Sequence, residues 1–99
     1  MKIYQTTVRS FYLYPENDKI IANTIDIIDD ILLNTDTNTA MIEHKKCADI
    51  YADEDVFNVT SNDLKVHVEN SDIYLSNIIE TVNDDCIVKT IVETITREV

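Results

Sequence analysis

The chain contains no glycine and one proline, so another residue must form every turn that needs a positive φ angle. Asparagine and aspartate tolerate that backbone region best, and the sequence has nine and twelve of them. Fifteen isoleucines, nine valines and eleven threonines add a strong bias toward strands, because branching at Cβ favours extended backbone. We therefore expect a sheet-containing fold whose turns use Asn and Asp.

The first half of the chain predicts a strand followed by a helix. Residues 2–14 alternate between two faces and are rich in aromatic and β-branched residues, which is typical of a long strand. After Pro15, the residues Glu16, Asn17 and Asp18 can cap a helix over residues 17–34. Its buried stripe would be Ile21, Ile25, Ile28 and Leu32. Residues 35–38 read as a loop, and residues 40–52 fit both a helix and a strand.

The second half predicts a hairpin, a helix and a last strand. Residues 56–60 and 64–69 alternate in hydropathy, and the polar residues 61–63 between them suit a turn. Ser71 and Asp72 can cap a second helix, for which the apolar positions would be Leu75, Ile78, Ile79 and Val82. Residues 86–99 predict a strand, although Ile87, Ile91 and Ile95 also suit a helix.

We therefore expect the α+β class, with a single compact acidic domain over residues 1–99, because a chain of this length supplies one core. The expected architecture is a small single-domain sheet with two or three helices packed on one face. The element order is compatible with a ferredoxin-like βαββαβ arrangement.

The net charge of −11 is distributed unevenly along the chain. Residues 16–39 carry −5 and residues 47–85 carry −9, whereas residues 1–15 carry +2 and residues 86–99 carry 0. Under the expected topology the acidic residues lie on helices and loops, and the two terminal strands carry little net charge. A one-sided negative field follows.

The sequence lacks the motifs of common enzymes. Without glycine there is no phosphate-binding P-loop, dinucleotide fingerprint or nucleophile elbow. His44 and Cys47 form a single HxxC pair without a second paired motif, so we expect no zinc site and reduced thiols at Cys47 and Cys86. A non-enzymatic protein without a cofactor is the expectation.

The segment DIYADEDVF, residues 49–57, is the densest acidic cluster of the chain. It can be read as a divalent-metal site, as a solvated loop that maintains solubility, or as a binding surface with aromatic anchors. It lacks the alternating ligands and the turn glycine of a calcium loop, so no metal site is expected. The candidate partner-binding residues are Asp26, Asp29, Asp30, Asp49, Tyr51, Asp53, Glu54, Asp55 and Phe57.

A charge of −11 repels nucleic acid, and Lys45-Lys46 is the sole pair of adjacent cations, so we expect no direct nucleic-acid binding. A basic groove with which another protein binds nucleic acid would attract the acidic residues of this chain. On the expected helix, acids at positions 26 and 29 or 30 would lie about 4.5–6 Å apart along its axis. This spacing is of the same order as the roughly 3.4 Å between charges along one DNA strand.

In its small size, acidity and lack of glycine the chain is similar to the DNA-mimic inhibitors that phages encode against restriction or CRISPR nucleases, a class that shares charge rather than sequence. The similarity implies a partner with a basic nucleic-acid-binding groove, such as a nuclease or effector complex, and a phage or mobile-element source. The alternative is a homodimeric structural or assembly accessory protein that pairs through its strand edges, with acid that serves solubility. No secretory signal or long apolar run is visible, so the expected location is the cytoplasm, that of the host cell for a viral protein.

Overall fold

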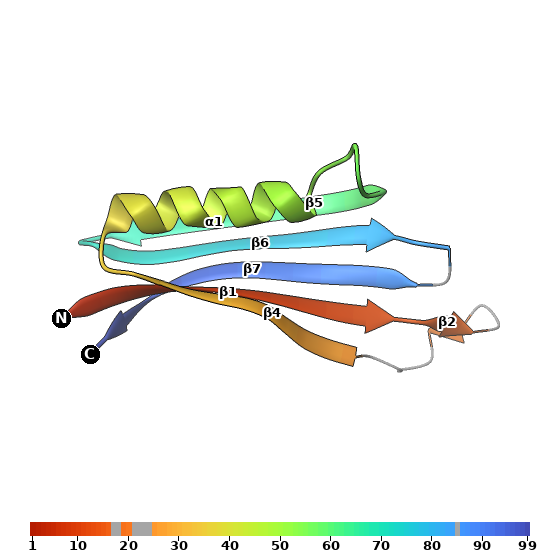
Figure 1. Ribbon diagram of the computed structural model, residues 1–99, viewed down its shortest axis with the longest axis horizontal. Coiled ribbons are helices and arrows are strands. Elements are labelled where there is room, and N and C mark those ends of the chain that lie inside the picture. Colours follow the sequence, from red (N-terminus) through yellow and green to blue (C-terminus); the bar gives the residue numbers. More distant parts are fainter. Residues whose placement is uncertain (17–18, 21–24, 85) are drawn as a thin grey trace.

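The computed structural model describes residues 1–16, 19–20, 25–84 and 86–99. Among them, a five-stranded antiparallel sheet is covered on one face by a single helix (Figure 1). The elements are β1 (Lys2–Leu13), β2 (Pro15–Glu16), β3 (Lys19–Ile20), β4 (Ile25–Asn34), α1 (Thr37–Tyr51), β5 (Val59–Glu69), β6 (Asp72–Val82) and β7 (Ile87–Glu98). The strand order is β4-β1-β7-β6-β5, and β2 pairs with β3 in a short separate ribbon. The expectation of two or three helices on a ferredoxin-like sheet is therefore wrong.

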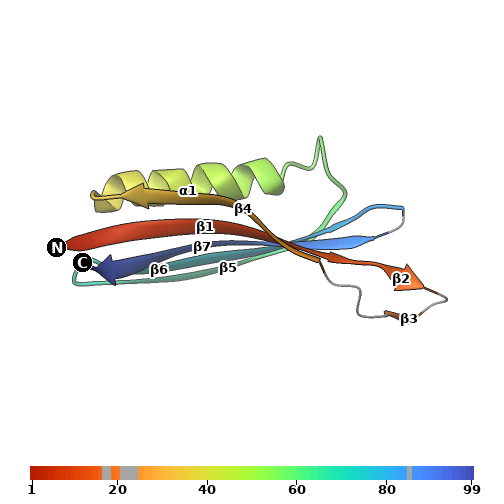
Figure 2. The same cartoon turned by 60° about the horizontal axis from the view of Figure 1, so that its bottom comes forward.

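The two ends of the chain meet in the middle of the sheet. β1 and β7 pair without interruption over twelve residues, from Lys2 opposite Glu98 to Leu13 opposite Ile87. The termini consequently lie side by side (Figure 2), and the backbone N–H of Val99 donates to the carbonyl of Met1 at 2.9 Å. This ladder joins the β1–β4 pair to the β5-β6-β7 meander.

The helix expected over residues 17–34 is wrong, because Ile25–Asn34 is strand β4. A β-bulge explains the misleading pattern: Val8 pairs with Asp30 and Arg9 pairs with Ile28, which leaves Asp29 as an extra residue. Because of this extra residue, Ile28 and Ile31 lie on the same face of the strand although they are three positions apart. A spacing of three is also typical of one face of a helix. The expected cap residues 17–18 and stripe residue 21 lie outside the described residues.

The hairpin and second helix expected in the second half are also wrong. Residues 59–69 form one continuous strand, and the expected helix is strand β6. The turn lies at Asn70 and Ser71, whose φ angles are 48° and 66°. An asparagine therefore supplies a positive φ angle, as the lack of glycine predicts, and a serine supplies the second. The terminal strands are confirmed, and the ambiguous segment 40–52 is mostly helix.

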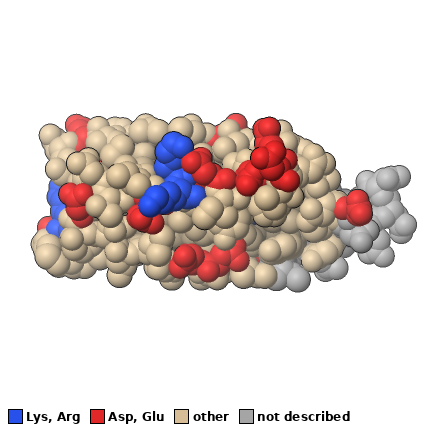
Figure 3. Space-filling model, turned by 45° about the horizontal axis from the view of Figure 1, so that its top comes forward, with Lys and Arg blue, Asp and Glu red and all other residues tan. Residues whose placement is uncertain are grey.

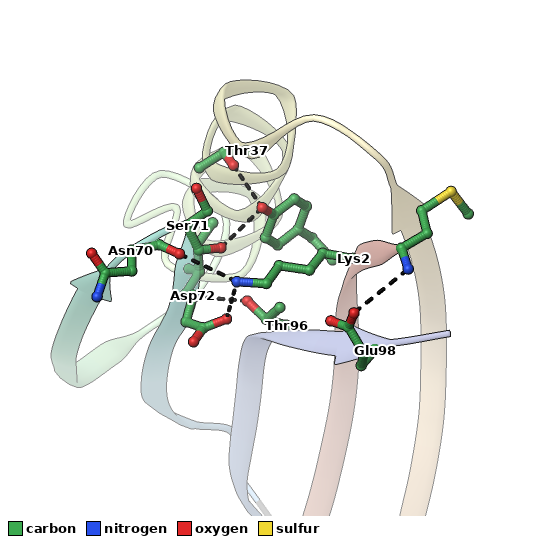
Figure 4. Close-up of polar contacts among 10 residues, drawn as sticks. Lys2, Thr37, Asn70, Ser71, Asp72, Thr96 and Glu98 are labelled. Atoms are coloured by element: carbon green, nitrogen blue, oxygen red, sulfur yellow. Dashed lines mark hydrogen bonds and ion pairs between the residues drawn. The ribbon is translucent and has the colours of Figure 1, made fainter.

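Side chains from β1 hold this turn against the start of α1 (Figure 4). The hydroxyl of Tyr4 donates to the carbonyl of Ser71 at 2.9 Å and accepts a bond from Thr37 at 2.8 Å. Lys2 Nζ donates to the carbonyl of Asn70 at 3.2 Å and forms an ion pair with Asp72 at 3.0 Å. One end of the sheet is thus tied to the first turn of the helix.

Helix α1 begins at a cap and lies close to the sheet through small residues. Asp36 accepts a hydrogen bond from the backbone N–H of Thr39 at 3.0 Å, and this bond lowers the pKa of the Asp36 carboxyl. Ala40, His44 and Ala48 recur every four residues and are buried against the sheet. Two small apolar clusters form the core, one around Ala40 and one around Ala48.

A buried polar network lies between these clusters. His44 Nε2 lies 2.7 Å from Asn77 Oδ1, and His44 Nδ1 lies 2.8 Å from the hydroxyl of Thr94. Thr94 in turn contacts Thr6 at 2.7 Å, and the Asn77 amide donates to Asn62 at 2.9 Å. Because the Asn77 oxygen can only accept, Nε2 carries the proton, and Nδ1 accepts from Thr94 in a neutral imidazole.

This network predicts a stability that depends on the charge of His44. Burial lowers the pKa of His44 below 6.5, although the bond with Asn77 raises it in part. The unfolded chain therefore binds the proton more readily, so this contribution to stability is complete above about pH 6.5 and is lost as pH falls through the folded-state pKa. Thermal unfolding by circular dichroism should show Tm falling between about pH 7 and about pH 5.

The variant His44→Gln should reduce this fall in Tm, because it removes the titrating group. His67 is exposed on β5, so His67→Gln serves as the matched control and should keep the wild-type fall. Equal falls in the wild type and in His44→Gln would contradict the assignment.

Candidate acidic binding surface

Most of the described cations already have an acidic neighbour. The ion pairs are Lys2–Asp72, Arg9–Asp26, Lys45–Asp49 at 2.7 Å, Lys46–Glu43 at 3.7 Å and Lys89–Glu80 at 4.0 Å. Two candidate binding residues, Asp26 and Asp49, therefore carry a compensated charge. Asp26 also lies on the face of the sheet away from α1, opposite Phe11 in the register.

The remaining candidate acids come from two segments near the C-terminal end of α1, which together we call the acidic end. It consists of Asp29 and Asp30 on β4 and of Asp53, Glu54 and Asp55 in the loop after α1. None of these five forms an ion pair with a side chain that the structure describes. Figure 3 shows acidic side chains gathered around the C-terminal part of α1 and beyond it.

The β-bulge places two of these acids beside the helix. Asp29 accepts a hydrogen bond from the hydroxyl of Ser10, and Asp30 accepts one from the backbone N–H of Ile31 at 2.8 Å. Ser10 belongs to the face that α1 covers. Both carboxylates lie on that face, whereas Asp26 lies on the other, so the expected row of acids at 26, 29 and 30 along one helix is wrong.

The electrostatic effect of these carboxylates reaches the last turns of α1. Burial raises the pKa of the Tyr51 phenol, and the nearby charges of Asp29 and Asp30 raise it further. Burial likewise raises the pKa of the Cys47 thiol, with a further contribution from Asp30. Asp29 and Tyr51 also line the same hollow, so the carboxylates of β4 lie close to the end of α1.

The loop after α1 is a tight turn that presents three successive acids. The carbonyl of Asp53 accepts bonds from the backbone N–H groups of Val56 at 3.1 Å and Phe57 at 2.8 Å. The Asp53 carboxylate accepts the N–H of Asp55 at 2.9 Å, and Glu54 and Asp55 are exposed. The last turn of α1 has no basic residue, so the negative end of the helix dipole adds to these charges.

The two candidate aromatic residues lie in the same place. Tyr51 and Phe57 are half-buried, and both line a hollow of about 170 Å³ that also includes Asp29 and Tyr12. The structure thus unites seven of the nine candidate residues around the acidic end. Asp26 lies on the other face of the sheet and pairs with Arg9, whereas Asp49 lies in the last turn of α1 and pairs with Lys45.

The structure contains a second hollow that the expected elements did not predict. A groove of about 410 Å³ runs between α1 and β5, with Met41, Leu64, Val66 and Leu75 among its lining residues. The alternation of Leu64, Val66 and Val68 was its signal in the sequence, but the expected hairpin divided β5 into two short strands.

Among residues 1–16, 19–20, 25–84 and 86–99, no three His, Cys, Asp or Glu side chains gather closely enough to hold a metal ion. In the same part of the chain, no helix has the length and apolar character needed to cross a bilayer. Comparison of the chain with family models, curated proteins and solved structures found no match.

The carboxylate of Asp30 near α1 predicts the reactivity of Cys47. In a Cys86→Ser background, Asp30→Asn should speed alkylation of Cys47 by iodoacetamide near neutral pH, because removing a nearby negative charge lowers the thiol pKa and raises the thiolate fraction. Asp63→Asn, an exposed acid of β5, is the control and should leave the rate unchanged. Equal rates for the two variants would mean that Asp30 does not face the helix.

Proposed function

We propose that the protein is a non-enzymatic inhibitor that places its acidic end in the basic nucleic-acid-binding groove of a host defence or DNA-processing protein. A restriction nuclease or a CRISPR effector complex has such a groove. One observation carries the proposal: none of the five acids of the acidic end forms an ion pair with a described side chain, whereas most of the acids described on other strands and on α1 have a cationic partner, with Asp63 and Glu93 as exceptions. The protein would act in the cytoplasm, that of the host cell if its source is a phage.

The arrangement of these acids suits contact with a row of cations. Asp53, Glu54 and Asp55 are adjacent in a loop that protrudes beyond α1 (Figure 1). Asp29 and Asp30 add two carboxylates from a neighbouring strand, and the helix terminus adds partial negative charge. A basic groove that binds phosphates would attract this concentration of charge from a distance and speed association.

Tyr51 and Phe57 would supply the apolar part of the contact. Both are half-buried beside Asp29, so part of each ring is available to a partner while its position is held. Aromatic side chains next to charges are frequent anchors of protein interfaces. Solubility alone requires neither the clustering of the acids nor aromatic residues among them.

The test is inhibition of DNA cleavage by a panel of purified restriction nucleases and CRISPR effector nucleases. The wild type should inhibit at least one of them, with an affinity that falls as salt rises through the physiological value. The double variant Glu54→Lys/Asp55→Lys should lose about tenfold or more in affinity, since each exposed charge pair contributes up to about 1 kcal/mol and reversal turns attraction into repulsion.

The matched control is Asp63→Lys/Glu69→Lys, which changes the net charge equally at exposed positions of β5 away from the acidic end. It should inhibit nearly as well as the wild type. Equal loss in both double variants would show that total charge, rather than the acidic end, matters. A wild type that inhibits no member of the panel would contradict the proposal.

A homodimeric accessory protein is the second candidate function. It is favoured by one observation, the large apolar content of the sheet face that α1 does not cover. That face supports a separate inference, which does not depend on the inhibitor proposal.

A further inference from the structure

The face of the main sheet opposite α1, here called the open face, is not covered by any described element (Figure 2). Its residues follow from the strand register. The apolar ones are Ile3, Phe11, Leu13, Ile28, Ile31, Leu33, Tyr74, Ile78, Val82, Ile87, Ile91 and Ile95. Several of these are strongly exposed, with 59% of Ile28, 53% of Ile31 and 63% of Leu33 accessible to solvent.

The sheet departs from the ordinary pattern because both of its faces carry apolar residues. An antiparallel sheet with one covered face usually presents polar residues to water and apolar residues to the helix. Here β7 directs Val88 and Val92 toward α1 together with Thr90 and Thr94, and all four are buried. The same strand places Ile87, Ile91 and Ile95 on the open face. Exposed isoleucine loses the stabilisation that burial of its apolar area would give, so this pattern indicates a face that is covered in the working protein.

The open face is also the part of the surface where charge is most nearly balanced. Among the described residues its cations are Arg9, Lys65, Lys89 and Arg97, and its acids are Asp26, Asp63, Glu69, Asp72, Glu80 and Glu93. Four cations against six acids leave a net charge of −2, whereas the whole chain carries −11. Two copies of so acidic a protein repel each other through most orientations. They repel least when the open faces meet.

The size of this face matches what a stable dimer needs. Neighbouring strands lie about 4.8 Å apart and each residue advances about 3.3 Å along a strand. Five strands of about ten residues therefore present roughly 800 Å², and a typical stable interface buries about 800 Å² on each partner.

We propose that a second copy of this chain packs on the open face, so that two sheets stack about 10 Å apart with both α1 helices outward. A two-fold axis brings one patch against itself, which suits a surface that carries apolar residues together with charges of both signs. Leu33, Ile31 and Ile28 of one copy become buried against the isoleucines of the other. Both acidic ends remain exposed in this dimer.

Pairing through strand edges is the competing mode of dimerisation. The edge of β4 is interrupted by the bulge at Asp29, and bulges and charges on edge strands oppose further pairing. The edge of β5 is regular from Ser61 to Glu69. Pairing through β5 would leave the open face exposed, so variants of the two surfaces can distinguish the two modes.

The experiment is sedimentation velocity of the full chain from low to high micromolar concentration. The wild type should sediment as a dimer at the upper concentrations. Ile28→Lys/Ile31→Glu keeps the net charge, alters only exposed positions of β4, and should raise the dimer dissociation constant at least tenfold. Its matched control is Leu64→Lys/Val66→Glu, which changes residues of β5 that are 60% and 57% exposed on the other face and should leave the dimer intact.

Thr7→Arg, at a half-buried position in the middle of the open face, gives a second variant if the first fails to fold by circular dichroism. It should also weaken the dimer. A wild type that remains monomeric at the highest concentration overturns the proposal. Loss of the dimer in Leu64→Lys/Val66→Glu, with retention in the open-face variants, also overturns it and assigns the contact to β5 instead.

Discussion

The pairing of β1 with β7 holds the rest of the structure in place, because it joins two units that share no other continuous ladder. β1 and β4 form one unit, and β5, β6 and β7 form the other. Helix α1 contacts strands of both units, so it packs well only when the ladder is formed. Residues at opposite ends of the chain must therefore meet before the core is complete, and closing so large a loop costs conformational entropy.

The same ladder brings the acids together. Asp29 and Asp30 belong to the first unit, while the loop at residues 53–55 leads into the second. Both segments lie near Tyr51 at the end of α1, since Asp29 of β4 and Phe57 after the loop line the same hollow as Tyr51. The bulge directs two successive carboxylates toward the helix, and burial beside these charges raises the pKa of Tyr51. The fold thus separates an acidic end from a nearly balanced, apolar open face.

The sequence predicted the terminal strands because their alternation of aromatic, β-branched and polar residues is uninterrupted. The sequence-based prediction of helices at β4 and β6 was wrong for two physical reasons. The bulge in β4 shifts the alternation by one residue, and β6 carries apolar residues on both faces, so that Leu75, Ile78, Ile79 and Val82 imitate a helical stripe. A strand that is apolar on both faces is expected where both faces become covered.

For the site, adjacency in the sequence sufficed to group Tyr51, Phe57 and the acids between them. The pairing of Asp26 with Arg9 joins residues seventeen positions apart and depends on strand register, so the sequence could not reveal it. The compensation of Asp49 by Lys45 was visible in principle, because residues four apart on a helix are neighbours. The pair follows from the sequence only if residues 40–52 form a helix, and their pattern also fits a strand.

The most direct test of the account is a two-dimensional ¹H–¹⁵N NMR titration of the protein with a short oligolysine peptide, which serves as a minimal basic groove. The account predicts that salt-sensitive shift changes concentrate at Asp29, Asp30 and residues 53–55 and leave the open face unaffected. Shift changes spread evenly over acids with and without cation partners, or centred on the open face, would contradict it.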